Sequence, residues 1–97
     1  MPSYLVETYL ARGRAGERGA GERRARSAAE ELTKRGTPVR FQSSVHVPED
    51  EICFFVFDAP SGPDAVLAAQ HAGLEPFRVV EAIASERTEH ECSKTCR

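Results

Sequence analysis

The 97-residue sequence predicts one α+β domain, in which a four-stranded antiparallel sheet carries two helices on one face in the ferredoxin-like order β-α-β-β-α-β. Three observations lead to this fold. Residues 52–57 are apolar throughout and rich in aromatic side chains, which is typical of a buried central strand. Residues 22–35 carry apolar side chains at helical spacing. Residues 61–73 begin and end with residues that cap helices.

The first strand is expected over residues 3–9. Its alternation divides the side chains between two faces, with Tyr4, Val6 and Thr8 on one and Leu5, Glu7 and Tyr9 on the other. Residues 10–21 are expected to form a mobile, solvated loop, because four glycines in this stretch oppose a packed element. Their spacing matches neither the P-loop nor the dinucleotide fingerprint, so no phosphate site is predicted there.

The first helix is expected over residues 22–35. Its apolar stripe consists of Ala25, Ala28, Ala29 and Leu32, and Gly36 followed by Thr37-Pro38 ends it. Arginines from Arg12 to Arg26 form a basic patch. Most such patches are solvated faces, and no aromatic residues interleave with this one as single-strand binding requires, so a nucleic-acid partner is not expected.

The remaining elements follow from alternation and turn signals. The second strand is expected over residues 39–47, and its side chains at 39, 41, 43, 45 and 47 should share one face. A polar turn then returns the chain as the strand 52–57. Ser61 caps the second helix, which ends at Gly73, and a fourth strand follows over residues 77–84. The domain is expected to span residues 1–85, with a flexible polar tail over residues 86–97.

Both faces of the strand 52–57 are apolar, and two helices can cover only one of them. An uncovered apolar face marks an interaction site, and a symmetric dimer is the commonest solution. We therefore expect a homodimer, with Phe55 facing the partner and Phe54 facing the helices, although alternation alone leaves open which of the two faces outward.

Composition excludes several other classes. The net charge of −2 offers no general attraction to nucleic acid or to an anionic membrane. The sequence contains neither a long apolar run nor a signal-peptide pattern, which predicts a cytoplasmic protein without a membrane partner. Three unevenly placed cysteines do not make a disulfide framework.

Two blocks of the chain resemble a known family. Pro2 with Leu5-Val6-Glu7, the aromatic hairpin ending Phe57-Asp58-Ala59-Pro60-Ser61, and Ala72-Gly73-Leu74 with the closing strand resemble small uncharacterised bacterial proteins described as domains of unknown function or as nickel-binding proteins. The resemblance implies a dimeric α/β barrel. It also matches Glu7 to the family's glutamate in the first strand. Where the family has an aromatic-x-His-Ser pattern, this chain has Phe41-Gln42-Ser43-Ser44, which places serine in the histidine position.

Candidate pocket residues are Glu7, Arg40, Ser43 and Cys53. A carboxylate in a half-buried strand needs a partner or a wet cavity, and Arg40 is a candidate partner for Glu7. Cys53 is interpreted as a small buried hydrophobe rather than a nucleophile, and His46 is expected to be an exposed residue at a strand end. In the tail, His90, Cys92 and Cys96 offer imidazole and thiolate ligands suited to nickel or zinc.

Three functions compete at this point. The first is a dimeric protein that binds a metal ion or another small ligand without catalysis. The second is a small enzyme resembling the monooxygenases of similar architecture, which rests on fold analogy alone. The third is a module that binds a partner or nucleic acid through the patch from Arg12 to Arg26.

Overall fold

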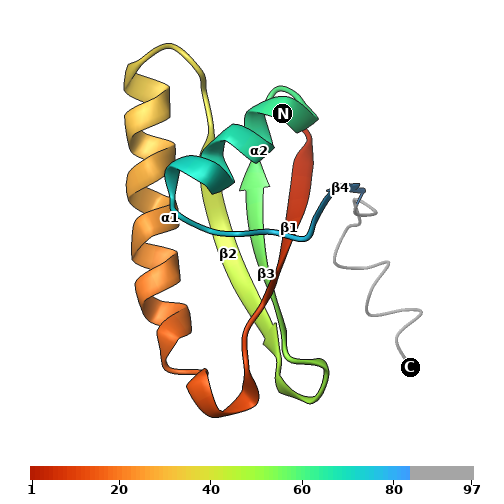
Figure 1. Cartoon of the computed structure of the whole chain (residues 1–97). Helices are drawn as coiled ribbons and strands as arrows, with labels where there is room; N and C mark the ends of the chain where they lie inside the picture. Colours follow the sequence, from red (N-terminus) through yellow and green to blue (C-terminus); the bar gives the residue numbers. More distant parts are fainter. Residues whose placement is uncertain (84–97) are drawn as a thin grey trace, which may run out of the picture.

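The computed structural model describes residues 1–83 (Figure 1). The elements follow the predicted order β-α-β-β-α-β, which confirms the ferredoxin-like α+β fold. They are β1 (Ser3–Tyr9), α1 (Glu17–Lys34), β2 (Arg40–Val47), β3 (Ile52–Asp58), α2 (Gly62–His71) and β4 (Arg78–Ala82), with 3-10 turns at Arg12–Arg14 and Pro48–Asp50. The predicted tail, residues 86–97, lies outside the described residues.

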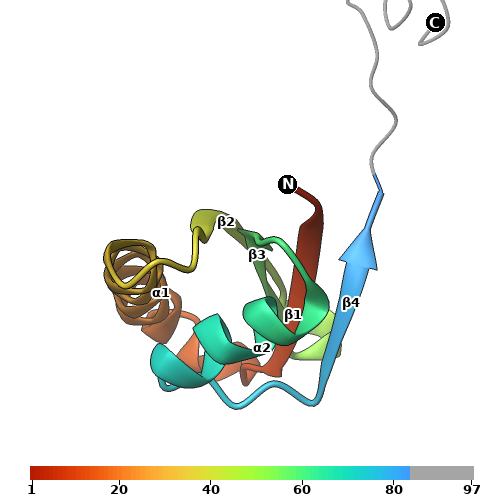
Figure 2. The same ribbon diagram turned by 90° about the horizontal axis from the view of Figure 1, so that it is seen from above.

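The strands form one sheet in the order β2-β3-β1-β4, and each neighbouring pair is antiparallel. Both helices pack on the same face of this sheet (Figures 1 and 2). The two β-α-β halves interleave, so that β1 and β3 become the inner strands. The apolar run predicted to be central therefore lies between β2 and β1.

The core lies between the helices and the sheet. Val6 and Phe57 are fully buried on the sheet, and the Phe57 ring meets that of Phe41 edge-on at a centroid distance of 5.5 Å. The predicted apolar stripe of α1 is buried, and one face of α2 is buried as well. The buried helix residues are Gly21, Ala25, Ala28, Ala29, Leu32, Ala65, Ala68 and Ala69. Because most of these residues are alanines, the helices approach the sheet closely and its aromatic side chains fill the space.

The loop predicted over residues 10–21 is wrong in its second half, because α1 begins at Glu17 and includes Gly19 and Gly21. Glycine within a helix costs about 1 kcal/mol relative to alanine, so local propensity opposes this extension. Tertiary packing favours the extension of α1, because Gly21 is buried against Phe55. A Cβ atom at this position would lie 2.8 Å from Cζ of Phe55, so the glycine permits the close approach of helix and ring.

The predicted faces of β2 are wrong after Phe41. Phe41 pairs with Phe57 and Ser43 with Val56, which leaves Gln42 as the extra residue of a β-bulge. The bulge reverses the alternation, because strand side chains point to opposite faces at every step. Residues 44 and 46 consequently turn toward the helices, while Val45 lies on the opposite face with half of its surface exposed.

β1 has the predicted bounds, whereas the other strands differ from the prediction at one end or both. β2 begins one residue later than expected, β3 continues to Asp58, and β4 is shorter than the predicted 77–84. The helix caps are as predicted: the Ser61 hydroxyl accepts from the Asp64 amide at 3.3 Å, and Gly73 has a positive φ of 76° after α2. No helix among residues 1–83 is long and apolar enough to cross a membrane.

Candidate functional site

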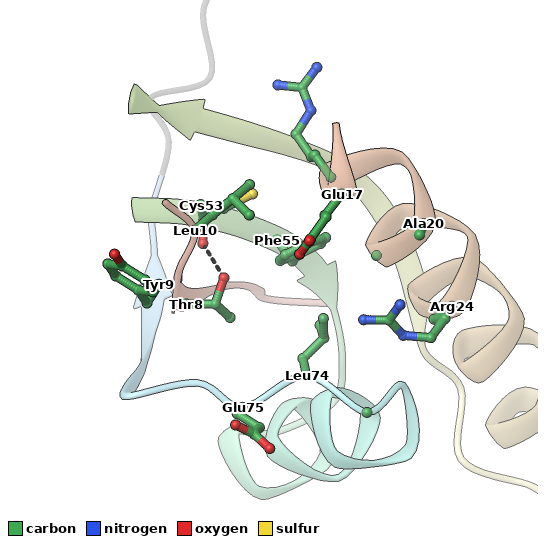
Figure 3. A pocket seen from close by; sticks show the side chains of 13 residues that line it. Thr8, Tyr9, Leu10, Glu17, Ala20, Arg24, Cys53, Phe55, Leu74 and Glu75 are labelled. Carbon is green, nitrogen blue, oxygen red and sulfur yellow. Dashed lines mark hydrogen bonds between the residues drawn. The ribbon is translucent and has the colours of Figure 1, made fainter. Parts of the chain in front are cut away.

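A cavity of about 510 Å³ lies between the first half of α1, the ends of β1 and β3, and the loop from α2 to β4 (Figure 3). It sits on the face of the sheet that carries the helices. Gly21 and Gly73 line the cavity with their backbone, and because they have no side chains they leave space there. Its volume is within the range of small-molecule sites, about 300–1,000 Å³.

The floor of the cavity is apolar. It consists of Cys53 and Phe55 from β3 and Leu74 from the loop, each at most 8% exposed. Burial raises the pKa of the Cys53 thiol; nearby Arg18 opposes this rise and Glu22 adds to it. The thiol is therefore protonated at neutral pH and acts as part of an apolar surface rather than as a nucleophile.

One polar side chain on the floor is already satisfied. The hydroxyl of Thr8 donates to the backbone carbonyl of Cys53 at 3.0 Å (Figure 3). Thr8 and Cys53 are direct cross-strand partners, and His46 is the partner of Cys53 on its other side. The ring of His46 lies with Nε2 at 3.3 Å from the carbonyl oxygen of Leu10, so this histidine is half-buried rather than exposed as predicted.

The charged wall comes mainly from α1. Glu17 and Arg24 project from this helix toward the cavity (Figure 3), and Arg18 also lines it. The carboxylate of Glu17 accepts from Nε of Arg14 at 2.7 Å, in an ion pair whose two side chains are both more than half exposed. Nε of Arg24 donates to the carbonyl of Ala72 at 2.9 Å, which ties α1 to the end of α2 and holds the guanidinium in place.

Glu51 binds the C-terminal end of β1 through Tyr9 and the following Leu10, and both of these residues line the cavity. Its carboxylate accepts from the backbone amide of Arg12 at 3.0 Å and from the Tyr9 hydroxyl at 3.2 Å, and its carbonyl accepts from the amide of Leu10. The amide of Arg12 and then the Tyr9 hydroxyl lower the pKa of Glu51, while the hydrogen bond to Glu51 raises the pKa of Tyr9. Sequence reasoning identified Glu51 only as a turn residue.

The four predicted pocket residues do not lie together. Only Cys53 lines the cavity, whereas Glu7, Ser43 and Arg40 belong to the opposite side of the sheet. Glu7 pairs with Arg78, with Oε2 and Nε 3.4 Å apart, and not with Arg40. Strand alternation explains this separation. Cys53 lies on the face of the sheet that carries the helices, whereas Glu7 lies on the uncovered face, and the bulge at Gln42 moves Ser43 away from the face of Phe41.

Arg40 contacts a carboxylate that sequence reasoning missed. Asp58 is 5% exposed and accepts from Nη2 of Arg40 at 2.9 Å, from the Ser3 hydroxyl at 2.7 Å and from the side-chain amide of Gln42. Burial opposes ionisation of Asp58, but these hydrogen bonds outweigh it and lower the pKa of the carboxyl. In the sequence, Asp58 appears only as a single acid directly after an apolar strand, and this pattern has no unique interpretation.

The predicted metal ligands His90, Cys92 and Cys96 lie outside the described residues. Within residues 1–83, no group of three or more His, Cys, Asp or Glu side chains is placed to hold a metal ion. Cys53 is free and buried.

The basic patch from Arg12 to Arg26 does not form one surface. Arg24 is bound to the end of α2, whereas Arg26 lies over the Phe41 ring on the β2 side, with Cζ 5.3 Å from the ring centroid. Arg14 is paired with Glu17. The arginines are thus distributed around α1, which disfavours a continuous track for a phosphate backbone.

No family model, curated protein or solved structure matches the chain.

Proposed function

We propose that this protein is a homodimeric binding protein, in which each protomer takes a small organic molecule into the cavity between α1 and the sheet. The observation that carries the proposal is the cavity itself, with its apolar floor of Cys53, Phe55 and Leu74 beneath a charged wall. Apolar pockets with a few placed polar groups are the usual form of small-molecule sites. Binding is favoured over catalysis because the thiol on the floor is protonated and the Thr8 hydroxyl is already engaged.

The homodimer is proposed from the face of the sheet that the helices leave uncovered. Leu5, Phe54, Val56 and Val80 are only partly buried there, and Val45 is half exposed. The same face carries the pair Glu7–Arg78 and the pair Asp58–Arg40, so its charges balance. Because these charges are paired within the protomer, the face carries no net charge from them that would repel a second copy of itself. The expected mass in solution is twice the 10.7 kDa of one chain.

The cavity is tested with a neutral bicyclic probe, 2-naphthol, in a fluorescence titration. The chain has no tryptophan, so its own emission is weak. Saturable binding at one site per chain is expected. Ala20→Phe should abolish it, because Ala20 lines the cavity and the added ring would occupy it.

The matched control is Ala15→Phe, which adds the same ring at an exposed residue just before α1 and should leave binding unchanged. A second control, Phe54→Glu, separates the cavity from the uncovered face, since only binding to that face would be lost. Binding that survives Ala20→Phe, or no binding at all, would refute the cavity as a ligand site.

A metal-binding role is a second proposal, motivated by the family resemblance and by ligand chemistry. Any nickel or zinc would be held by His90, Cys92 and Cys96, because thiolate and imidazole bind such ions far better than isolated carboxylates do. Nickel and zinc titrations under reducing conditions test it against the double variant Cys92→Ser/Cys96→Ser. Equal affinity and stoichiometry in the two proteins would exclude the tail site.

A further inference from the structure

Arg24 is an exposed residue that lines the edge of the cavity, and it also borders a neighbouring hollow beside Glu31 and His71. It extends from α1 toward the space beside Leu74 (Figure 3). Its Nε is committed to the carbonyl of Ala72 at 2.9 Å, and Ala72 is the buried C-terminal cap of α2. Within residues 1–83 this carbonyl is the one acceptor that Arg24 meets, so its two terminal nitrogens have no protein acceptor in that range.

The acids of the cavity do not use this guanidinium. Glu17 is paired with Arg14 at 2.7 Å and forms no ion pair with Arg24 among the described contacts. Glu75 follows Leu74 in the loop, and Figure 3 shows its carboxylate on the side of the loop away from the Leu74 side chain. The lining carries two glutamates and two arginines, so the case for an anion rests on Arg24, which has no carboxylate partner among residues 1–83.

On this basis we propose that the ligand of the cavity is an amphipathic anion, with a carboxylate or similar head on Arg24 and an apolar body on Cys53, Phe55 and Leu74. This inference rests on the proposed cavity function and adds the chemical class of its ligand. A fixed, planar guanidinium with two free nitrogens matches the two oxygens of a carboxylate, and its orientation by Ala72 lowers the entropy lost on binding. The protonated Cys53 thiol and the Phe55 ring offer a dry surface for a hydrocarbon or aromatic body.

Three probes with one bicyclic body and different heads test the class: 2-naphthoate, 2-naphthol and 2-naphthylmethylamine. With the full chain, the carboxylate is expected to bind about tenfold more tightly than the neutral probe, because a charge-assisted bidentate contact adds to the same apolar burial. The amine should bind more weakly than both.

Arg24→Gln should remove the preference for the carboxylate while leaving the affinity for 2-naphthol unchanged. Arg24→Lys keeps the charge without the planar fork and should restore part of the preference. Arg23→Gln is the matched control, because this neighbouring arginine does not line the cavity. Circular dichroism of each variant verifies that it is folded, and unchanged binding of 2-naphthol verifies that its cavity is intact.

The outcomes separate this inference from the function on which it rests. Equal affinity for all three heads, or a preference for the amine, would overturn the anionic class of the ligand, and a carboxylate preference that survives Arg24→Gln would overturn Arg24 as the residue that holds the head. Each of these results would leave the cavity standing. Failure of all three probes to bind, or binding that ignores Ala20→Phe, would overturn both.

Discussion

The two faces of the sheet carry a comparable supply of apolar side chains but differ in what covers them. On the helix face, Val6, Cys53, Phe55 and Phe57 are at most 4% exposed. On the other face, Phe54 and Val56 come from the same strand and alternate with these residues, yet they remain partly exposed. An apolar strand therefore predicts burial on both sides, but among residues 1–83 only the helix face is covered (Figure 2).

The faces also differ in their polar groups. The charged groups over the helix face sit on the wall of a cavity, whereas Glu7, Arg78, Asp58 and Arg40 form ion pairs on the sheet itself. The helix face consequently suits a small molecule that enters from the side. The uncovered face suits a broad, charge-balanced partner such as a second copy.

The largest expected effect is on the helix face. Phe57→Ala should lower the free energy of unfolding by about 3–5 kcal/mol, because a fully buried ring leaves a cavity beside Phe41. Urea unfolding followed by circular dichroism measures it. Phe54→Ala, studied at low protein concentration, is the comparison and should cost clearly less, because its ring is already partly solvated. Equal losses would mean that the two faces are equivalent in the single chain.

A charge on the uncovered face should affect association rather than folding. Phe54→Glu is expected to raise the dimer dissociation constant on the order of 100-fold, because a partly exposed aromatic is lost from the proposed interface and a carboxylate would have to be buried there on association. Sedimentation velocity measures it.

The reverse substitution sharpens the contrast. Phe55→Glu should unfold the protein, since Phe55 faces the helices and not the partner, contrary to the sequence prediction. Leu67→Glu places the same charge at an exposed apolar residue of α2 and should neither unfold the protein nor weaken the dimer. A wild-type protein that is monomeric at micromolar concentration would end the dimer proposal.

The buried carboxylate on the uncovered face predicts a pH dependence. Its folded-state pKa is lowered, so Asp58 stabilises the fold fully above the ordinary aspartate pKa of about 3.9 and loses this contribution as the pH falls through the lower folded value. At pH 7, Asp58→Asn should cost about 2 kcal/mol, because hydrogen bonds to a charged group are weakened.

Denaturant unfolding over a series of pH values measures this effect. The difference between wild type and Asp58→Asn should stay constant at neutral pH and shrink below about pH 4, where Asp58 of the unfolded chain begins to take up a proton while the folded carboxyl stays ionised to lower pH. Glu49→Gln, in the exposed turn before β3, serves as the control and should change stability little at any pH. A difference that does not depend on pH would show that Asp58 acts through shape alone.

The smallest expected effect distinguishes two glycines of α1. Gly19→Ala should stabilise the protein by about 1 kcal/mol through helix propensity, since the nearest atom to the new Cβ is 3.8 Å away on the flexible Arg23 side chain. Gly21→Ala should instead destabilise by about 1 kcal/mol, because overpacking against Phe55 exceeds the same gain. Thermal unfolding compares them, and stabilisation by both would disprove the close packing of Gly21.

Part of this molecule was determined by sequence patterns alone. The order of elements, the central position of residues 52–57, the buried stripe of α1 and the caps at Ser61 and Gly73 all follow from local periodicity and local hydrogen bonding. These signals operate within a few residues, so a sequence displays them directly. The same periodicity, continued backwards from Ala28, also reaches Arg24 and Gly21, so part of the cavity wall was within reach of this reasoning.

The remainder was decided only in three dimensions. Four glycines led to the prediction of a loop over residues 10–21. Two of them lie in α1 despite their low helix propensity, because Gly21 allows Phe55 to pack closely against the helix. A bulge of one residue at Gln42 reversed the faces of β2, and the parity of two distant strands placed Glu7 and Cys53 on opposite sides of the sheet. Such outcomes depend on register between segments far apart in the chain, and a one-residue change in register exchanges the two faces. The cavity is likewise a product of how three separate segments pack, and for that reason the pocket residues chosen from the sequence, apart from Cys53, lay elsewhere.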